Sequence, residues 1–193
     1  MKWITTTQAL DELSSSQDSL VWRTFCDHFR PVVENFAKQL GLTITDAEDA
    51  AQQTMIEFVE SFRKGKYQKE KGRLSNWLFG IAKRVVLNIR SHQPLEHLIA
   101  DKTTGTSFWD IVQDDKILNL TWETEWQQMV LKRCLEKVHQ EFDRKVYEAF
   151  NLYALSEMPV KEVCKKLGMS PNAVYISKSR VLSRLRELKR EFE

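Results

Sequence analysis

The sequence lacks the features that mark membrane proteins and secreted proteins. Its 193 residues contain no run of about 18 apolar side chains, and its first eleven residues lack the basic and then apolar pattern of a signal peptide. It has only three cysteines, Cys26, Cys134 and Cys164, with no C-x-x-C pair, so we expect neither disulfides nor a zinc site. We therefore expect a cytoplasmic chain with no membrane insertion.

Glycine is also scarce, and the motifs built on it are missing. None of the six glycines forms G-x-x-x-x-G-K-[ST] or G-x-G-x-x-G, and there is no nucleophile elbow and no H-E-x-x-H. Asp46, Glu48 and Asp49 form an acidic cluster, but they stand at the start of a predicted helix, where the helix dipole favours carboxylates. We therefore predict no catalytic residue, no cofactor and no metal, in a protein that is not an enzyme.

Strand signals are nearly absent, whereas apolar side chains recur throughout with a period near 3.6 residues. This pattern predicts an all-α fold with two small helical domains joined by a linker. We assign residues 1–18 to an N-terminal arm, 19–92 to the first domain, 93–125 to the linker and 126–193 to the second domain, a helix-turn-helix.

Three helices are predicted in the first domain. The first runs from about Ser19 to Leu40, with Leu20 on its buried face, a kink or division at Pro31 and Gly41 as its stop. The second runs from Thr45 or Asp46 to about Lys64, and the third from Leu74 to about Ser91. The third helix has an apolar stripe that includes Trp77, and its other face carries Asn76, Phe79, Lys83, Arg84 and Asn88.

Charge is balanced over the whole chain but not along it. The formal net charge is +2, yet residues 1–60 carry four basic and ten acidic side chains, and residues 61–92 carry nine basic and one acidic. Residues 93–126 are again acidic, and residues 127–193 have fourteen basic against nine acidic side chains. Two cationic blocks are what a polyanion-binding protein would show, although a charge run is more often a solvated face.

The second cationic block contains two predicted helices separated by a glycine. Residues 160–167 carry apolar side chains at i, i+3, i+4 and i+7, Gly168 supplies a left-handed turn, and Ser170-Pro171 starts the next helix. That helix buries Val174 and Val181 and turns Arg and Ser outward, which is the arrangement of a DNA-binding helix-turn-helix. An ordinary helical hairpin with a solvated outer face is the alternative. DNA is favoured because this helix carries six cations and only one acidic residue, Glu187, among them. Without a bound polyanion these cations would repel one another.

The outward side chains of this helix have distinct chemistries. Tyr175, Ser179 and Arg180 could reach base edges in the major groove, and Tyr175 and Ile176 could touch thymine methyl groups. Cations further round the helix would more plausibly grip phosphate, which positions a protein without specifying a sequence. The predicted duplex-binding residues are Tyr175, Ile176, Lys178, Ser179, Arg180, Ser183 and Arg184.

Three segments together resemble a bacterial RNA polymerase sigma factor of the sigma-70 family, extracytoplasmic-function (ECF) class. Residues 46–53, DAEDAAQQ, are similar to the start of the family's core-binding helix. Residues 73–84, RLSNWLFGIAKR, resemble its promoter-melting helix, and residues 160–180 resemble its −35-reading motif. The resemblance covers about residues 20–92 and 128–190.

The resemblance implies two functions for the first domain. Asp46, Asp49, Gln52 and Gln53 would bind the coiled coil of the polymerase largest subunit. The basic loop and the open face of the third helix would hold the melted strand of the −10 element, since single-stranded DNA binds cationic grooves with aromatic platforms. The residues implied are Lys66, Tyr67, Lys69, Lys71, Arg73, Asn76, Phe79, Lys83, Arg84 and Asn88.

A sigma factor that directs core polymerase to −35/−10 promoters is thus the predicted function. Its partners would be promoter DNA and the polymerase core, including the flap of the second subunit, and an anti-sigma protein is a further candidate. A helix-turn-helix regulator that binds duplex DNA alone is the alternative, and a module that sequesters polymerase is a third. The basic loop and the Trp77 helix favour the sigma factor, because a regulator needs no single-strand groove.

Overall fold

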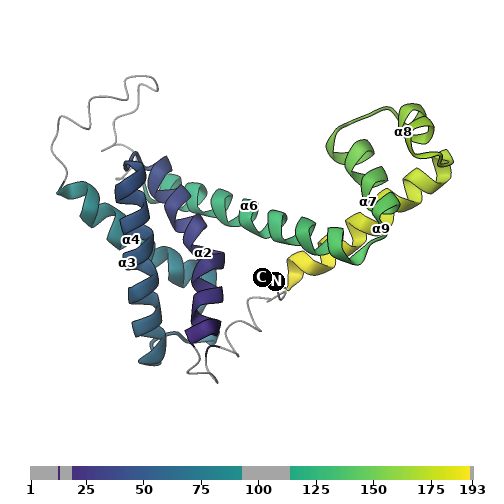
Figure 1. The fold of residues 1–193 in the computed structure, drawn as a ribbon. Helices are drawn as coiled ribbons and strands as arrows, with labels where there is room; N and C mark the ends of the chain where they lie inside the picture. Colours follow the sequence, from purple (N-terminus) through teal and green to yellow (C-terminus); the bar gives the residue numbers. More distant parts are fainter. Residues whose placement is uncertain (1–12, 14–18, 93–113, 192–193) are drawn as a thin grey trace. The chain divides into compact units, whose positions relative to one another are not determined.

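A computed structural model describes residues 13, 19–92 and 114–191. Within these ranges the elements are helices and no strand occurs (Figure 1), so the predicted all-α class is confirmed for this part of the chain. The described residues divide into two compact units, an N-terminal one that ends at Gln128 and a C-terminal one that begins at Met129.

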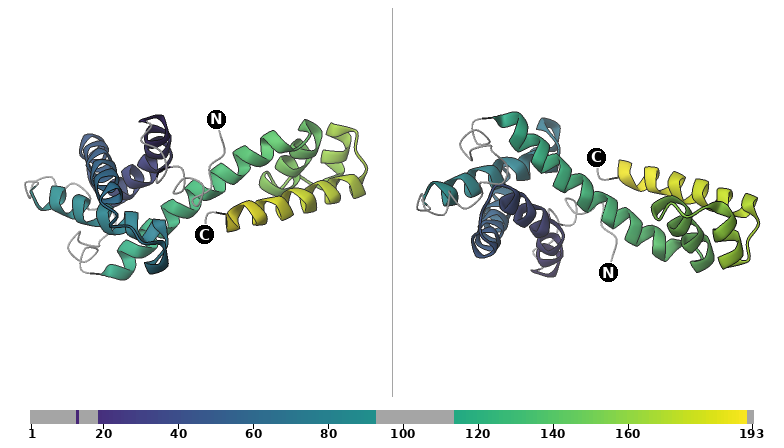
Figure 2. Two further views of the ribbon diagram at one scale, coloured as in Figure 1. Left: turned by 90° about the horizontal axis from the view of Figure 1, so that it is seen from below. Right: turned by 90° about the horizontal axis from the view of Figure 1, so that it is seen from above.

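The N-terminal unit is a helical bundle. Its elements are α2 (Ser19–Gln39), α3 (Ile44–Arg63), the 3₁₀ turn η1 (Lys69–Lys71), α4 (Leu74–Ser91) and the first part of α6 (Asp115–Glu141). Helix α3 packs against both α2 and α4, as Figures 1 and 2 show. Aromatic rings fill the space between them: the rings of Phe25 and Phe58 stack at 4.5 Å between centroids, and Phe36 is fully buried.

The turn between α2 and α3 forms where glycine was predicted to stop the first helix. Gly41 has a φ of +80°, a conformation that L side chains rarely adopt, and its N–H donates to Lys38 O at 2.9 Å. Buried Arg90 of α4 donates from Nη1 to Gly41 O at 2.9 Å, so the end of α4 is tied to this turn. Helix α3 then begins with Thr43 as its N-cap.

Helix α2 differs from the sequence prediction in two details. Of the kink or division predicted at Pro31, the division does not occur: α2 continues through this residue, which lies on the exposed side of the helix. Leu20 is 64% exposed rather than buried. The buried residue in this turn is Trp22, which meets the edge of Phe62 at 5.6 Å between ring centroids. Residues two apart lie on nearly opposite sides of a helix, so burying Trp22 turns Leu20 outward.

Helix α6 begins at Asp115, before residue 126, where the linker was expected to give way to the second domain. Its first part therefore occupies residues 115–125, which we had assigned to the linker. Trp122 is buried against α4: its ring lies 5.5 Å from that of Phe79, and its Nε1–H donates to Ser75 Oγ at 3.1 Å. Phe79, expected on the open face of the third helix, is consequently half-buried.

The C-terminal unit contains the end of α6 and four further elements, α7 (Arg144–Phe150), the π-helix η3 (Asn151–Leu155), α8 (Val160–Leu167) and α9 (Pro171–Arg190). Ala149, Val163 and Val174 form its buried centre. Gly168 has a φ of +58° and ends α8 as predicted, and Ser170 Oγ caps α9 by accepting from Ala173 N–H at 3.2 Å. Cys26, Cys134 and Cys164 are free thiols, and burial raises the pKa of the Cys134 thiol to about 11.

Replacing Trp122 with alanine should destabilise the N-terminal unit by about 3–5 kcal/mol, because the substitution leaves a cavity the size of an indole ring. Urea unfolding of the full chain, followed by circular dichroism, measures the loss. Leu120→Ala is the matched control on the same helix: Leu120 is 69% exposed, so the expected change is below about 0.5 kcal/mol. Equal losses for both variants would contradict the packing described.

Candidate nucleic-acid and protein interfaces

The loop between α3 and α4 is held by Tyr67. The Tyr67 ring lies 5.0 Å from that of Trp77 and 6.1 Å from that of Phe62, and its hydroxyl donates to Gly72 O at 3.2 Å. Burial raises the pKa of the Tyr67 phenol, with a smaller contribution from the carboxylate of Glu70. The phenol therefore stays protonated, and its hydrogen bond closes the loop.

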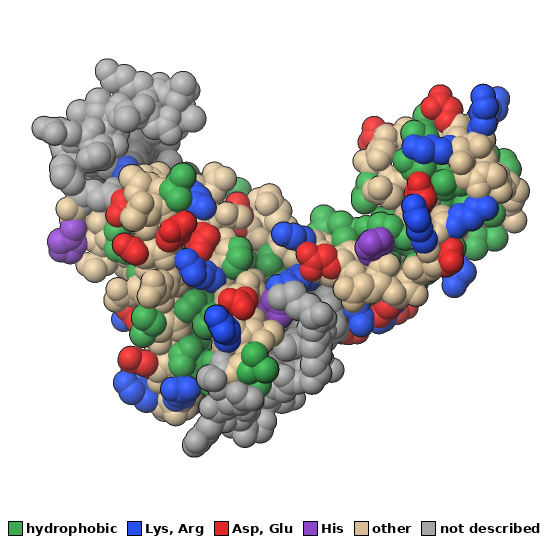
Figure 3. Space-filling model, in the orientation of Figure 1, with side chains coloured by type: hydrophobic (Ala, Val, Ile, Leu, Met, Phe, Trp, Pro, Cys, Tyr) green, Lys and Arg blue, Asp and Glu red, His purple; other side chains and the backbone are tan. Residues whose placement is uncertain are grey.

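Cations surround this closed loop. Lys66, Lys71 and Arg73 are exposed, and Lys69 belongs to the 3₁₀ turn η1. In Figure 3, Lys and Arg side chains lie at the lower end of the N-terminal unit, where α3 runs into the loop. The predicted cationic residues thus lie next to an aromatic cluster, although Tyr67 itself is half-buried.

Helix α4 presents fewer open groups than predicted. Asn76, Arg84 and Asn88 are exposed, whereas Lys83 and Phe79 are half-buried. The Phe79 ring lies 5.8 Å from Phe36 as well as close to Trp122, so it packs within the bundle and is not an open platform.

Two cations of α4 have carboxylate partners. Lys83 Nζ lies 2.6 Å from Asp115 Oδ1 at the start of α6, and Arg84 forms an ion pair with Glu57 of α3. Each pair includes one largely exposed side chain. Surface pairs of this kind contribute about 0–1 kcal/mol, so a phosphate could take over either cation at little cost in stability.

The outer face of α3 carries the predicted protein-binding residues, with one exception. Asp49, Gln52 and Gln53 are exposed, and Figure 3 shows acidic side chains gathered over the first half of this helix. Asp46 is half-buried and belongs to the helix cap, because its carboxylate accepts from Thr43 Oγ1 at 2.6 Å.

An apolar side chain on this face was missed. Ile56 is 52% exposed and follows Gln52 and Gln53 by four and three residues, so it lies on their side of the helix. The same spacing could have identified it in the sequence. Ile56 could form the apolar centre of a protein contact, since the core of an interface is more apolar than its rim.

The first half of α9 exposes most of the side chains predicted to read duplex DNA. Tyr175, Ile176, Ser179, Arg180 and Ser183 are exposed, and Lys178 is half-buried. Asn172, which we had not considered, is also exposed and precedes Ser179 by two helical turns. Its amide could bond an adenine edge in the major groove.

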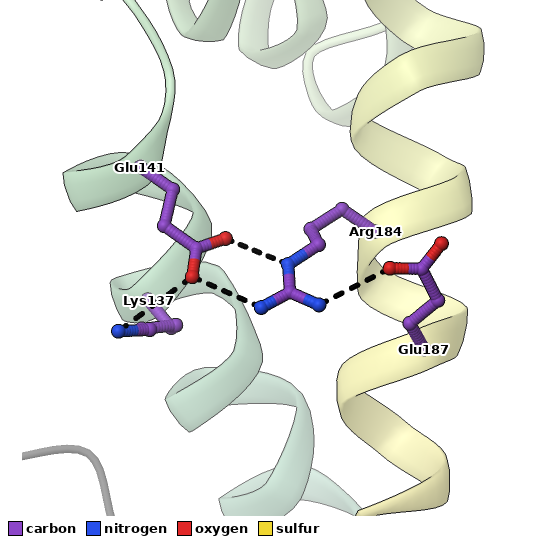
Figure 4. Close-up of polar contacts among 4 residues, drawn as sticks. All are labelled: Lys137, Glu141, Arg184 and Glu187. Carbon is purple, nitrogen blue, oxygen red and sulfur yellow. Dashed lines mark hydrogen bonds and ion pairs between the residues drawn. The ribbon is translucent and has the colours of Figure 1, made fainter.

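Arg184, by contrast, is half-buried between α6 and α9 and bound to carboxylates of the C-terminal unit (Figure 4). Its Nε and Nη2 donate to the two carboxylate oxygens of Glu141 at 2.7 and 3.0 Å, and its Nη1 donates to Glu187 at 3.1 Å. These bonds lower the pKa of Glu141, to which Lys137 adds a further ion pair at 3.6 Å, and raise that of Arg184. The six cations of this helix were expected to face one acidic residue, but Glu141 of α6 supplies a second.

Residues 25–95 match the family model for sigma-70 region 2. This match supports a sigma factor of the sigma-70 family, whose members are transcription initiation factors and not enzymes. It spans most of α2 and all of α3 and α4, and it implies interaction with the RNA polymerase core and promoter DNA. No curated protein and no solved structure matches the chain. None of the described helices combines the length and apolar character of a membrane span.

The Arg184–Glu141 clamp should make the stability of the C-terminal unit depend on pH. The folded pKa of Glu141 is lowered, so its stabilising contribution is complete above its ordinary value of 4.5 and is lost as pH falls through the lower, folded value. We expect the melting temperature of the native chain to fall more steeply from about pH 5 to about pH 3 than that of Arg184→Met.

Arg186→Met is the control for this measurement, because Arg186 is exposed on the same helix. Its melting temperature should follow the native pH profile. If Arg184→Met keeps the native dependence of melting temperature on pH, or if Arg186→Met loses it equally, the ion pair between Arg184 and Glu141 is not the source of the pH dependence.

Proposed function

We propose that the chain is an ECF-class sigma factor that binds core polymerase, directs it to −35/−10 promoters and helps to open them. The observation that carries the proposal is the region 2 match over a unit with two chemically different surfaces, an acidic helix face and a cationic loop with aromatic rings. A polymerase subunit that also holds a melted strand needs one surface of each kind.

Core polymerase would bind the outer face of α3. Asp49, Gln52 and Gln53 supply charge and hydrogen-bonding groups, and exposed Ile56 supplies the apolar centre of the contact. The expected counterpart is the coiled coil of the largest subunit. Asp46 would contribute indirectly, since its bond with Thr43 sets the start of the helix.

The loop and α4 would hold the non-template strand of the −10 element. Exposed Lys66, Lys71 and Arg73 would meet phosphates, with Lys69 on the same loop. Asn76 and Asn88 would offer amides to unpaired bases, and the Tyr67–Trp77 pair is the nearest stacking platform. Capture of a flipped base there would offset an unstacking cost of a few kcal/mol.

Lys83 and Arg84 would join this single-strand binding site by exchanging their carboxylate partners for phosphates. Both cations are bound to carboxylates, so a phosphate must displace Asp115 or Glu57. Because surface ion pairs are weak, a strand anchored elsewhere can drive that exchange.

Helices α8 and α9, with Gly168 between them, would form a helix-turn-helix that reads the −35 duplex. Tyr175, Ile176, Ser179 and Arg180 would face base edges, and Arg180 could bond guanine with two donors. Ser183 and Lys178 would contact the backbone, and Arg184 would orient α9 through Glu141. In this proposal residues 19–92 and 126–193 are the two working domains, joined by a linker whose last part is the start of α6, and the protein acts in the bacterial cytoplasm.

Transcription from a template library with randomised −35 and −10 elements tests the proposal. Bacterial core polymerase with the full chain should yield run-off transcripts from a subset of templates that share both elements, whereas core alone should not. A regulator that binds duplex DNA by itself would instead select templates without core and add no new start sites. Output that the chain leaves unchanged would refute the sigma factor.

Reversing one charge on α3 tests the polymerase contact. Asp49→Lys should weaken association with core polymerase about tenfold or more, which corresponds to about 1.4 kcal/mol, because a cation replaces an exposed carboxylate at the proposed contact. Fluorescence anisotropy of the labelled chain titrated with core measures the affinity. Glu123→Lys, an exposed reversal on α6, is the control and should bind like the native chain.

A further inference from the structure

Two residues proposed to meet duplex DNA contact the same ring from outside their helix. The Tyr153 ring of η3 lies 5.6 Å from that of Tyr175 at an interplanar angle of 73°, an edge-to-face arrangement. Lys178 Nζ lies 5.0 Å from the Tyr153 ring centroid, over its face. One aromatic side chain therefore touches two side chains of α9 that are three residues apart.

The π-helix brings Tyr153 to this position. Ser156 N–H donates to Asn151 O and Met158 N–H to Leu152 O, both at 2.9 Å, so the turn is wider than an α-helical one. Tyr153 also packs against the buried centre of the unit, formed by Ala149, Val163 and Val174. The Tyr153 side chain thus packs on the buried centre of the unit and also contacts α9.

The segment that follows is strained. Glu157 has a φ of +53°, in the left-handed region that non-glycine residues seldom adopt, at a typical cost of about 1–3 kcal/mol. Such strain persists only where the surrounding contacts impose it, and single π turns often occur at functional sites.

We infer that Tyr153 is a positioning residue for sequence reading by α9: it fixes Tyr175 against base edges and Lys178 against a phosphate. The inference rests on the proposed −35 function. Lys178 has a four-carbon stem and Tyr175 is 47% exposed, so without a partner both side chains would sample several rotamers. Holding them in place reduces the side-chain entropy lost on binding. The ammonium keeps donors for phosphate, since the ring meets it from one side.

Binding selectivity of two variants at Tyr153 tests the inference. The full chain, assembled with core polymerase, is titrated with duplex −35 probes selected by the native protein and with single-mismatch probes. Tyr153→Phe retains the ring and should keep the native selectivity ratio. Tyr153→Leu loses the ring and should lower that ratio about threefold or more at the base pairs nearest Tyr175, and it should add little to the loss caused by Tyr175→Ala.

A purely structural role predicts a different result. Tyr153→Leu would then weaken binding to every probe by the same factor, in parallel with its loss of thermal stability, and the selectivity ratio would stay native. That outcome overturns the inference, as does Tyr153→Phe behaving like Tyr153→Leu.

Arg180→Ala separates this inference from the proposed function. If the native assembly shows no sequence preference among duplex probes, the −35 function and the inference both fail. If Arg180→Ala loses selectivity while Tyr153→Leu keeps it, the −35 function stands and the inference alone is overturned.

Discussion

The indole of Trp122 of α6 packs between α2 and α4 in the N-terminal unit. It meets the edge of Phe36 of α2 at 5.4 Å, lies against Phe79 of α4, and donates its N–H to Ser75. A buried indole N–H without an acceptor would carry a desolvation cost, so the hydrogen bond fixes the register of α6 along α4. With that register set, Asp115 lies beside Lys83, and Phe79 packs inward. The groups left open on α4 are a consequence of where one ring is buried.

Helix α6 has a corresponding effect in the C-terminal unit. Glu141, in its last turn, takes both oxygens to one edge of the Arg184 guanidinium. A planar fork bound in this way has a defined orientation, whereas a single contact leaves the side chain free to swing. Arg184 therefore fixes α9 against α6 and is less available to DNA than Arg180, which is exposed and lies 5.6 Å from the ring of Phe142.

Local patterns were sufficient for much of the fold. The end of α2 just before Gly41, the bounds of α4 and the Gly168–Ser170 turn follow from periodicity, glycine and capping, which involve residues close together in the sequence. The errors have another origin. Phe79 packs on Trp122, and Lys83 pairs with Asp115. Both partners lie in the stretch that was assigned to the linker. No local sequence pattern predicts such a contact, because its two residues lie in different helices.

Some of the candidate site residues could likewise be predicted from local sequence patterns, and others could not. Exposure of Asp49 or Ser179 follows from the helix period, so those positions could be predicted. The role of Asp46 as a cap was visible in principle, since Thr43 precedes it by three residues. The π-helix was not visible, because it depends on backbone bonds such as Ser156 N–H to Asn151 O rather than on residue type. Tyr153 therefore gave no functional signal in the sequence.

Lys83, Arg84 and Arg184 differ in the number of bonds that they make to carboxylates. Lys83 and Arg84 each have a single ion-pair contact with a carboxylate, and one member of each pair is largely exposed. Arg184 has two bonds to one carboxylate and a third to another. A phosphate competes with a weak surface pair but must replace three hydrogen bonds to free Arg184. Counting positive charges in a helix therefore overstates the surface open to DNA, and the number of bonds that each cation already makes decides which of them can be exchanged.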